Sequence, residues 1–339
     1  MLTKDDIEVF ILTYNRAILL KKSVDSILNQ TIGAVKITII DNASTDNTEC
    51  IISELQKSYT NLYYIKQPKH FDYFAQNVKT AQELAQKKYV MFFHDDDIAH
   101  PQYLEIAISL INKYKNVDLI CTLLKEFSNE KVLKFKDFKN IKYVMFPNKL
   151  DFTAHMYVSM FIDHKSLCFP NIIYKTENIK NVMMDYNIGG KASDKPFVVS
   201  TLRNGICLQI REPEIFNYRI HNGQDSKSTK IDPNLSQIIN HQLFFKKQLY
   251  QSKQYKIWFD AYSFDWIDLF YTWGNNNPSR CEKKLFLRQA LKAGALSRRA
   301  FFAKHGFLKI IFKYLDKKVK LKIKKQVENI EILNFKIGK

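Results

Sequence analysis

Three consecutive aspartates, Asp95, Asp96 and Asp97, follow the apolar stretch YVMFF at residues 89–93. A short apolar run of this kind predicts a buried strand, so the carboxylates stand at its carboxyl end. Three adjacent like charges repel one another, and burying them without partners would be costly. Because hard divalent cations take oxygen ligands, the triplet indicates a cation site. An isolated triplet fits an acidic loop or a helix cap equally well.

A second carboxylate stands in a similar place. Asp41 ends the stretch KITIID at residues 36–41, which also predicts a strand. In open α/β sheets, ligands bind beyond the carboxyl ends of the strands. We therefore expect Asp41 and the three aspartates to lie at one edge of a sheet.

Alternating strands and helices must position these carboxylates. The strands are expected at residues 7–13, 36–41, 62–66, 89–93 and 117–124. The helices are expected at residues 18–29, 47–59, 73–87 and 101–115. Repeated βα units predict an α/β fold with a parallel sheet and right-handed crossovers. The sequence lacks a glycine-rich phosphate loop, so a metal or side chains must handle any phosphate.

The remaining chain gives weaker patterns. Residues 131–138 alternate lysine with apolar residues, which suits an edge hairpin. Further strands are expected at 169–175 and 206–220, and further helices at 150–162, 195–203, 237–273 and 280–296.

The composition of the 339 residues restricts the partners. Fifty-two Lys and Arg oppose 34 Asp and Glu, giving a net charge of +18. Such a charge favours nucleic acid, nucleotide phosphates or an anionic membrane. The five cysteines lie far apart without metal-ligand spacing, which indicates reduced thiols. Residues 1–6 do not resemble a signal peptide, and no run of about 18 apolar residues occurs, so a cytoplasmic location is expected.

Four segments together resemble glycosyltransferase family 2, the inverting, nucleotide-sugar-dependent class with the GT-A fold. The segments are FILTYNR at 10–16, DNASTD at 41–46, Gln76-Asn77, and HDDD at 94–97. Each is weak alone, but they follow the order and approximate spacing of the family and cover about residues 7–120.

The resemblance implies a role for each matching residue. It assigns nucleotide-sugar binding to Thr13, Tyr14, Asn15, Arg16, Asp41, Asn77, Asp95, Asp96, Arg219 and His221. Thr13 and Asp41 would line the base pocket, where Asp41 would accept from the uracil imide and favour a UDP donor. Asp95, Asp96 and Asp97 would hold Mn²⁺ or Mg²⁺ against the diphosphate.

Two departures from the family pattern concern this site. His94 stands where the family usually has the first aspartate, so the register of the metal ligands stays open. Either Asp95 and Asp97 match by spacing, or Asp96 is the chief ligand, and we expect Asp96 with the other two assisting. His70-Phe71-Asp72 replaces a usual Asn-x-Gly, so the sugar-side wall is expected to differ.

The resemblance also implies a general base. Asp194 follows the pair Gly189-Gly190, which allows close backbone approach to a ligand, and precedes an expected helix. It matches the acidic residue that deprotonates the acceptor hydroxyl in the family, although it could simply cap the helix. Further along, Arg219 and His221 lie in a Tyr-Arg-x-His ending like that of many members and could close over the diphosphate.

We therefore expect transfer of a sugar from a UDP-sugar to a saccharide or lipid-linked saccharide during synthesis of a bacterial surface glycan, lipopolysaccharide or capsule. A catalytic domain is expected at 1–230 and a helical region at 231–339. The basic, aromatic-bearing tail at 298–325 suits peripheral binding to the cytoplasmic face of the inner membrane, although a solvated helix would look similar.

Two other functions fit part of the sequence. A nucleic-acid-binding protein would explain the positive charge, but it would not need strand-terminal aspartates. A metal-dependent nucleotidyltransferase would use the carboxylates, yet it would normally need a phosphate-binding loop near residues 13–16. We expect no nucleic acid partner.

Overall fold

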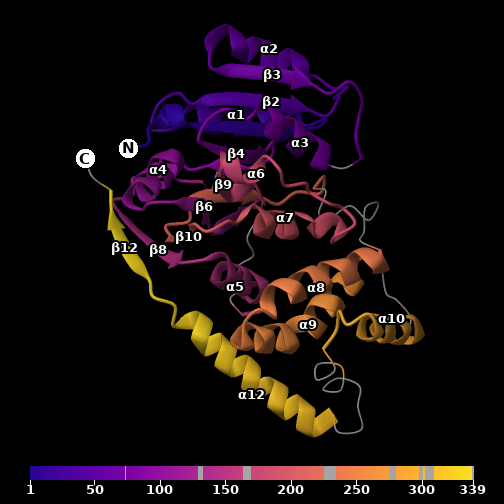
Figure 1. The fold of residues 1–339 in the computed structure, drawn as a ribbon. Helices are drawn as coiled ribbons and strands as arrows, with labels where there is room; N and C mark the ends of the chain where they lie inside the picture. The colour runs from indigo at the N-terminus through magenta and orange to yellow at the C-terminus, as the bar shows by residue number, and fades with distance from the viewer. Residues whose placement is uncertain are drawn as a thin grey trace.

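The computed structural model describes residues 1–72, 74–128, 133–162, 169–224, 234–274, 280–297, 301 and 309–337. A nine-stranded sheet in the order β12-β8-β10-β6-β9-β4-β1-β2-β3 runs through its centre (Figure 1). Helices pack on both faces of this sheet, so the fold is α/β and GT-A-like, as expected from the sequence.

The first half of the sheet is parallel. Strand β1 pairs with β2 and with β4, and β2 pairs with β3, all in parallel register. The bounds are β1 Ile7–Thr13, β2 Lys36–Asp41, β3 Leu62–Lys66 and β4 Tyr89–His94. The helices between them are α1 Ala17–Leu28, α2 Thr48–Ser58, α3 Ala75–Leu84 and α4 Tyr103–Lys113. The expected helix at 73–87 is shorter than predicted because the backbone is already extended at Ala85.

The second half of the sheet is mixed, which the expectation of a parallel sheet did not include. Strand β9 (Ile172–Lys175) runs antiparallel to both β4 and β6 (Val117–Thr122). Strand β10 (Ile206–Glu212) is parallel to β6 and antiparallel to β8 (Asn140–Phe146). The expected hairpin at 131–138 is not borne out by its described part, because residues 133–138 carry no strand and β8 begins later. Residues 131 and 132 lie outside the described residues.

A small second sheet carries one wall of the site. Its order is β5 (Ile98–Ala99), β11 (Phe216–Arg219) and β7 (Leu124–Phe127). Two expected strands, at 117–124 and 206–220, are therefore each divided between the two sheets. The chain thus passes from β10 in the large sheet to β11 in the small sheet. The last residue of β11, Arg219, donates its backbone N–H to Asp97.

The core lies on both faces of the large sheet. Along β1, Val9 and Ile11 face one apolar cluster while Phe10 and Leu12 face the other. This alternation follows from the period of two in a strand. Both faces of β1 are buried, so its residues are almost all apolar, as is usual for a central parallel strand.

The helices of the second half cover one face of the sheet and extend away from it (Figure 1). They are α5 Lys149–Ile162, α6 Thr176–Ile179, α7 Asp194–Thr201, α8 Leu235–Leu249, α9 Lys253–Gly274, α10 Arg280–Lys292 and α12 Lys309–Glu328. Short 3₁₀ turns occur at Lys4–Asp6, Phe169–Asn171 and Gly190–Ala192. The helical stretch expected at 237–273 forms two helices, α8 and α9, separated by a turn.

The chain returns to the large sheet at its end. Strand β12 (Leu333–Lys336) pairs antiparallel with β8 and forms the edge of the sheet (Figure 1). The division into 1–230 and 231–339 stays a prediction, and residues 225–233 at its boundary lie outside the described part. Within the described ranges, every helix is too short or too polar to cross a membrane.

Candidate active site

The three aspartates lie in the turn after β4, at the carboxyl end of the parallel strands. The backbone register of β1 with its two neighbours places Leu12 beside His94 and Thr13 beside Asp41. The strand ends of β1, β2 and β4 therefore meet at one edge, as predicted. Asp95, Asp96 and Asp97 are all buried, with exposures of 2%, 5% and 0%.

Asp95 turns toward the end of β1. Its Oδ2 accepts from the Thr13 hydroxyl at 2.7 Å and from the Tyr14 backbone N–H at 3.2 Å. Its Oδ1 pairs with the Arg16 guanidinium at 3.0 Å. Both of its oxygens are thus engaged by the β1 turn, and Asp95 does not belong to the group of side chains that converge as a metal site. Its expected role as an assisting metal ligand stays a prediction.

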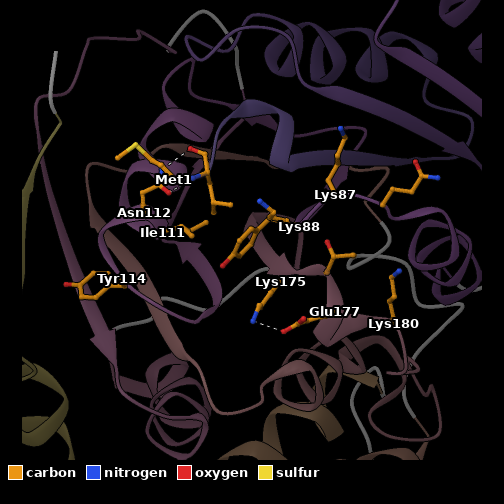
Figure 2. Close-up of a pocket in the computed structure, with 13 residues that line it drawn as sticks. Met1, Lys87, Lys88, Ile111, Asn112, Tyr114, Lys175, Glu177 and Lys180 are labelled. Carbon is orange, nitrogen blue, oxygen red and sulfur yellow. Dashed lines mark hydrogen bonds and ion pairs between the residues drawn. The ribbon is translucent and has the colours of Figure 1, made fainter.

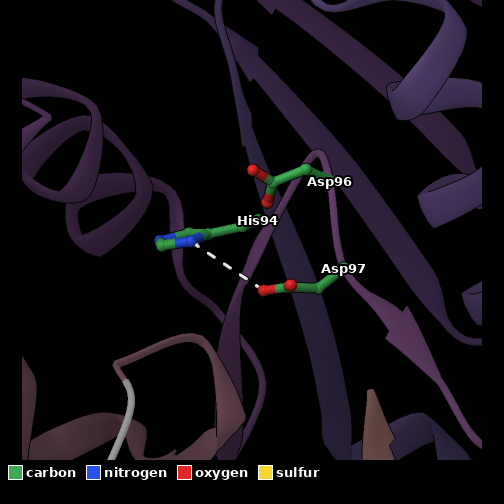
Figure 3. Close-up of side chains that lie close together, drawn as sticks. All are labelled: His94, Asp96 and Asp97. Carbon is green, nitrogen blue, oxygen red and sulfur yellow. Dashed lines mark ion pairs between the residues drawn. The ribbon is translucent and has the colours of Figure 1, made fainter. Parts of the chain in front are cut away.

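His94, Asp96 and Asp97 converge instead. One ligand atom from each lies within 4.8 Å of the others, and Figure 3 shows the three side chains around the end of β4. His94 Nδ1 is 4.0 Å from Asp97 Oδ2. That same Oδ2 is buried and receives no hydrogen bond from the described residues. Carboxylate oxygens suit Mg²⁺ and Mn²⁺, so the two aspartates fit the expected cation, and the His94 imidazole offers a third ligand atom.

The electrostatics of the turn favour a cation as well. Burial is the main cause that raises the pKa of Asp95 to about 6, and Arg16 opposes the effect. Burial and the adjacent Asp96 charge raise the pKa of Asp97 well above its ordinary range. A divalent cation at the turn would offset both the cost of burying these charges and the repulsion between them.

Arg219 and His221, the expected diphosphate residues, do reach this turn. His221 Nε2 lies 3.0 Å from Asp96 Oδ2. Arg219 Nε donates to the Asp96 carbonyl at 2.7 Å, and its guanidinium lies over the Phe127 ring at 4.6 Å. Arg16 donates to the Gly223 carbonyl at 2.7 Å, which ties the same segment to the end of β1. Segments more than 200 residues apart in the sequence thus form one cluster.

The turn after β1 is held by its contacts with the turn after β2. Asn15 has a positive φ of 50°, which asparagine tolerates better than most residues. Its side-chain oxygen accepts from the Thr45 N–H at 2.7 Å. Tyr14 lies against His70 with ring centroids 4.2 Å apart. These contacts hold the turn after β1, and the predicted nucleotide contacts of Tyr14 and Asn15 stay predictions.

Asp41 is completely buried. Its Oδ1 accepts from both the N–H and the hydroxyl of Ser44, at 2.9 and 2.5 Å, and its Oδ2 accepts from the Tyr64 hydroxyl at 2.6 Å. A carboxylate oxygen has two lone pairs, so Oδ2 can accept one further donor. The turn-forming role and the predicted contact with a base are therefore compatible.

Asn77 has a partner inside the protein. It is buried on α3, and its side-chain oxygen accepts from Gln67 Nε2 at 3.2 Å. This contact fixes α3 against the residue that follows β3. The predicted donor contact of Asn77 stays a prediction.

Asp194 is the first residue of α7. The N-cap is Ser193, and no side chain caps the helix, so Asp194 does not serve as the cap. Its Oδ1 is buried and lacks a hydrogen-bond partner among the described residues. Phe197, one turn along α7, packs on Phe169, with centroids 5.9 Å apart, and Phe169 lies 6.3 Å from the His94 ring. The ring of Phe169 therefore lies between Phe197 on α7 and His94 of the candidate metal group.

His94 is the residue that sequence reasoning did not place in the metal group. It was noted only as a departure from the family pattern, although it directly precedes the aspartates. The available signal was chemical: a histidine at the end of a buried strand, beside carboxylates, is itself a potential ligand.

A cavity of about 680 Å³ lies elsewhere, at the amino ends of β4 and β6 (Figure 2). Four lysines line it, but Lys88 pairs with Asp6 at 2.8 Å and Lys175 pairs with Glu177 at 2.6 Å. The cavity contains none of the residues of the aspartate turn. It is therefore not part of the candidate active site.

Comparison with known proteins agrees with this geometry. Residues 8–177, half of the chain, match the model of the family described as glycosyl transferase family 2. The chain is 28% identical over 228 residues to the uncharacterized glycosyltransferase MJ1057 of Methanocaldococcus jannaschii, which covers 64% of this chain and 71% of that protein.

A second relative has a more specific description. It is the GalNAc(5)-diNAcBac-PP-undecaprenol beta-1,3-glucosyltransferase of Campylobacter jejuni, 27% identical over 146 residues. The match covers 41% of this chain and less than half, 47%, of that enzyme.

Two solved structures share the fold. S. aureus TarS 1-349 in complex with UDP-GlcNAc superposes with a TM-score of 0.63 at 15% identity, covering 95% of this chain and 90% of that one. The mannosyltransferase PcManGT of Pyrobaculum calidifontis, in complex with GDP-Man and Mn²⁺, has a TM-score of 0.50 at 12% identity, covering 96% and 86%. With the family match, the strand-end aspartates and this fold, the chain belongs to glycosyl transferase family 2 and is a nucleotide-sugar-dependent glycosyltransferase.

Proposed function

We propose that this enzyme transfers a sugar from a UDP-sugar to a saccharide hydroxyl with inversion, and that Asp194 is the general base. The observation that carries the assignment is the buried Oδ1 of Asp194, which neither caps α7 nor accepts a hydrogen bond from the described residues. A buried carboxylate oxygen without a donor costs free energy unless a ligand or water satisfies it. An acceptor hydroxyl would supply that missing donor.

The chemistry assigned to each residue follows. Positive charge develops at the anomeric carbon as the bond to the diphosphate breaks. Asp194 would take the proton of the attacking hydroxyl, an effect worth roughly 10²–10⁴ in rate. Arg16, which already pairs with Asp95 and Asp96, and the neighbouring His221 would hold the diphosphate end of the donor.

His94, Asp96 and Asp97 are the residues that would hold Mn²⁺ or Mg²⁺. The cation would supply Lewis-acid stabilisation of the departing nucleoside diphosphate. Asp97 Oδ2 is buried and lacks a hydrogen bond from the described residues, so the cation would give it a positive partner.

The proposal of UDP rests on the base pocket. Oδ2 of buried Asp41 retains one lone pair that could accept the imide N–H of uracil. Its fixed position, held by Ser44 and Tyr64, would present an acceptor without reorganisation. The TarS structure contains UDP-GlcNAc, whereas PcManGT contains GDP-Man, so the guanine nucleotide is the informative competitor.

A nucleotide panel tests the donor assignment. UDP and GDP are titrated into the enzyme with Mn²⁺, and UDP-sugars and GDP-sugars are then assayed for release of the nucleoside diphosphate. We expect UDP to bind at least about tenfold more tightly than GDP, a difference of about 1.4 kcal/mol. Tighter binding of GDP, or release of pyrophosphate instead of UDP, would contradict the proposal.

We also propose a saccharide or lipid-linked saccharide of a bacterial surface glycan, of the lipopolysaccharide or capsule type, as the acceptor. The description of the Campylobacter relative names an undecaprenol-linked substrate, which supports an acceptor of this class. Peripheral binding to the cytoplasmic face of the inner membrane would bring the enzyme to such an acceptor.

Helix α12 offers a surface for that binding. Its buried side carries Ile323 and Val327, while Lys320 pairs with Asp316 at 3.2 Å. Its outer side carries Lys317, Lys318, Leu321, Lys322 and Lys325, all exposed. Basic residues near an anionic bilayer contribute about 1 kcal/mol each, and an exposed leucine among them can insert at the interface. Of the tail predicted at 298–325, residues 298–300 and 302–308 lie outside the described part.

A further inference from the structure

A second hollow, which we call the α5 groove, lies far from the aspartates. It has a volume of about 640 Å³ and is formed by the start of α5, the connection from α7 to β10, and the turn between α8 and α9. The volume is within the range of small-molecule sites. The groove therefore lies between the predicted catalytic region and the helices that follow it.

Two cations, Lys149 and Arg203, line this groove. They are close enough that the charge of Arg203, together with the larger effect of burial, lowers the pKa of Lys149. Across the described ranges, neither side chain has a salt-bridge or hydrogen-bond partner. Two adjacent positive charges without a counter-ion constitute an unfavourable arrangement that a dianion would relieve.

No acidic group nearby forms a salt bridge with either cation in the described residues. Asp151 lines the groove and keeps its charge, while its two oxygens accept from the Tyr255 hydroxyl and from Asn148 Nδ2. Asp118 attracts Lys149 electrostatically, and its Oδ2 accepts from the backbone N–H groups of Arg203 and Gly205. The two cations that line the groove therefore exceed its single carboxylate by one positive charge. The two cations keep their capacity for an external anion.

Amide side chains make up another part of the wall. Gln248 lies near the end of α8, Gln251 in the turn that follows it and Gln254 at the start of α9, and Tyr255 adds an aromatic ring beside them. Gln251 makes one long hydrogen bond, of 3.5 Å, to the Lys247 carbonyl. Within the described structure, the side chains of Gln248 and Gln254 have no partner. Each amide offers both donors and an acceptor, which suits the hydroxyl groups of a sugar.

We propose that the α5 groove binds a sugar phosphate, with the phosphate between Lys149 and Arg203 and the sugar hydroxyls on the glutamine amides. The phosphate would replace the missing counter-ion, and a lysine with an arginine is a common pair for such a group. The ligand is either a free sugar phosphate or a phosphate-bearing unit of a glycan chain. The proposal concerns binding alone and does not depend on the reaction assigned to Asp194.

The groove is separate from the aspartate turn and from Asp194, none of which line it. Asp194 begins α7, and Arg203 follows the end of that helix at Thr201. Eight residues of α-helix span about 12 Å, so the two sites lie at opposite ends of α7. A ligand in the groove would contact the enzyme without occupying the aspartate turn.

Calorimetric titration of the full chain tests the proposal, with saturating UDP and Mn²⁺ present to keep donor-site binding out of the signal. The probes are glucose 6-phosphate, its methyl phosphodiester, inorganic phosphate and glucose. A monoester that binds more tightly than the diester indicates a free sugar phosphate, and the reverse indicates a phosphate within a glycan chain. We expect a phosphorylated glucose to bind at least several-fold more tightly than inorganic phosphate, and glucose alone to give no signal.

The variant Lys149→Gln/Arg203→Gln should weaken binding of the phosphorylated glucose by at least about tenfold. The control Lys247→Gln/Lys253→Gln removes the same charge at exposed positions beside the groove and should leave binding unchanged. Arg203→Gln alone, at an exposed side chain, gives a second test if Lys149 is needed for folding. Equal loss in the control pair, inorganic phosphate binding as tightly as the sugar phosphate, or no binding to the wild type would overturn the proposal.

Discussion

At the scale of single residues, the side chains after β4 divide into two roles. Asp95 is held by the β1 turn, whereas His94, Asp96 and Asp97 converge around one point. The sequence predicted that these carboxylates end a buried strand at the ligand-binding edge. It could not predict which way each carboxylate points, because that depends on Arg16 and on the positive φ of Asn15 in a different segment.

The metal group gives a direct prediction at this scale. Asp96→Asn should abolish measurable Mn²⁺ binding, because the amide removes the charge and leaves Asp97 unassisted. His94→Gln should weaken Mn²⁺ by at least about tenfold, since one ligand of the group is lost. Isothermal titration with Mn²⁺ measures both effects.

Asp72→Asn, at a highly exposed side chain, is the matched control and should bind Mn²⁺ normally. Normal affinity in His94→Gln would show that the aspartates alone hold the ion, and it would exclude His94 from the site.

At the scale of elements, the feature that matters most for the site is an expected strand that is divided between two sheets. Residues 206–220 look like one strand in the sequence, but β10 belongs to the large sheet and β11 to the small one. The periodicity of apolar residues cannot reveal such a change, because both pieces alternate in the same way. The expectation for α5 and for the first four strands held because each is defined by its own local pattern.

Helix α8 carries a fully buried histidine, His241. Burial, together with the charge of Lys195, lowers the pKa of His241 to about 3. The Cβ that a side chain would add at Gly189 would lie 2.9 Å from His241, so the ring supports the turn that precedes Asp194. His155 on α5 is also buried, and its pKa is likewise lowered to about 3 by burial and Arg211.

These histidines predict how stability depends on pH. Each stays neutral in the folded protein but takes up a proton near about pH 6.5 when unfolded. Their contribution is complete above that pH and is lost as the pH falls toward 3. At about pH 5 each should cost about 2 kcal/mol of unfolding free energy. His241→Leu should therefore reduce the loss of stability between about pH 7 and about pH 5 by about that amount.

Urea unfolding at the two pH values measures the change, with His70→Gln, at an exposed site, as the control. The same loss of stability in His241→Leu and in the wild type would show that the buried histidine does not carry the acid sensitivity.

At the scale of the whole molecule, the end of the chain joins the central sheet. Strand β12 follows helix α12 and pairs with β8, so the chain beyond the helices returns to the large sheet (Figure 1). This strand could not be predicted from the sequence, because residues 333–336 are a short, weakly apolar run. The positive charge and helical character of the last hundred residues, in contrast, could be predicted from their composition.

The basic outer side of α12 predicts membrane binding at this scale. Replacing Lys317, Lys318, Lys322 and Lys325 by glutamine should remove up to about 4 kcal/mol of attraction to an anionic bilayer. Flotation with vesicles that contain anionic lipid should therefore show loss of the bound fraction. Substitution of Lys87, Lys115, Lys139 and Lys180, which removes equal charge elsewhere, should have a small effect. Equal loss in both variants would indicate general charge attraction and not a specific surface.

The measurement that tests the central claim most directly is a comparison of Asp194→Asn with the wild type. Asparagine keeps the shape of the side chain but cannot accept a proton, so turnover should fall by roughly 10²–10⁴. Binding of UDP with Mn²⁺ should remain unchanged, because Asp194 is assigned to the acceptor and not to the donor. Asp185→Asn, an exposed residue in the same connection, should retain full turnover. Near-normal turnover of Asp194→Asn would contradict the account.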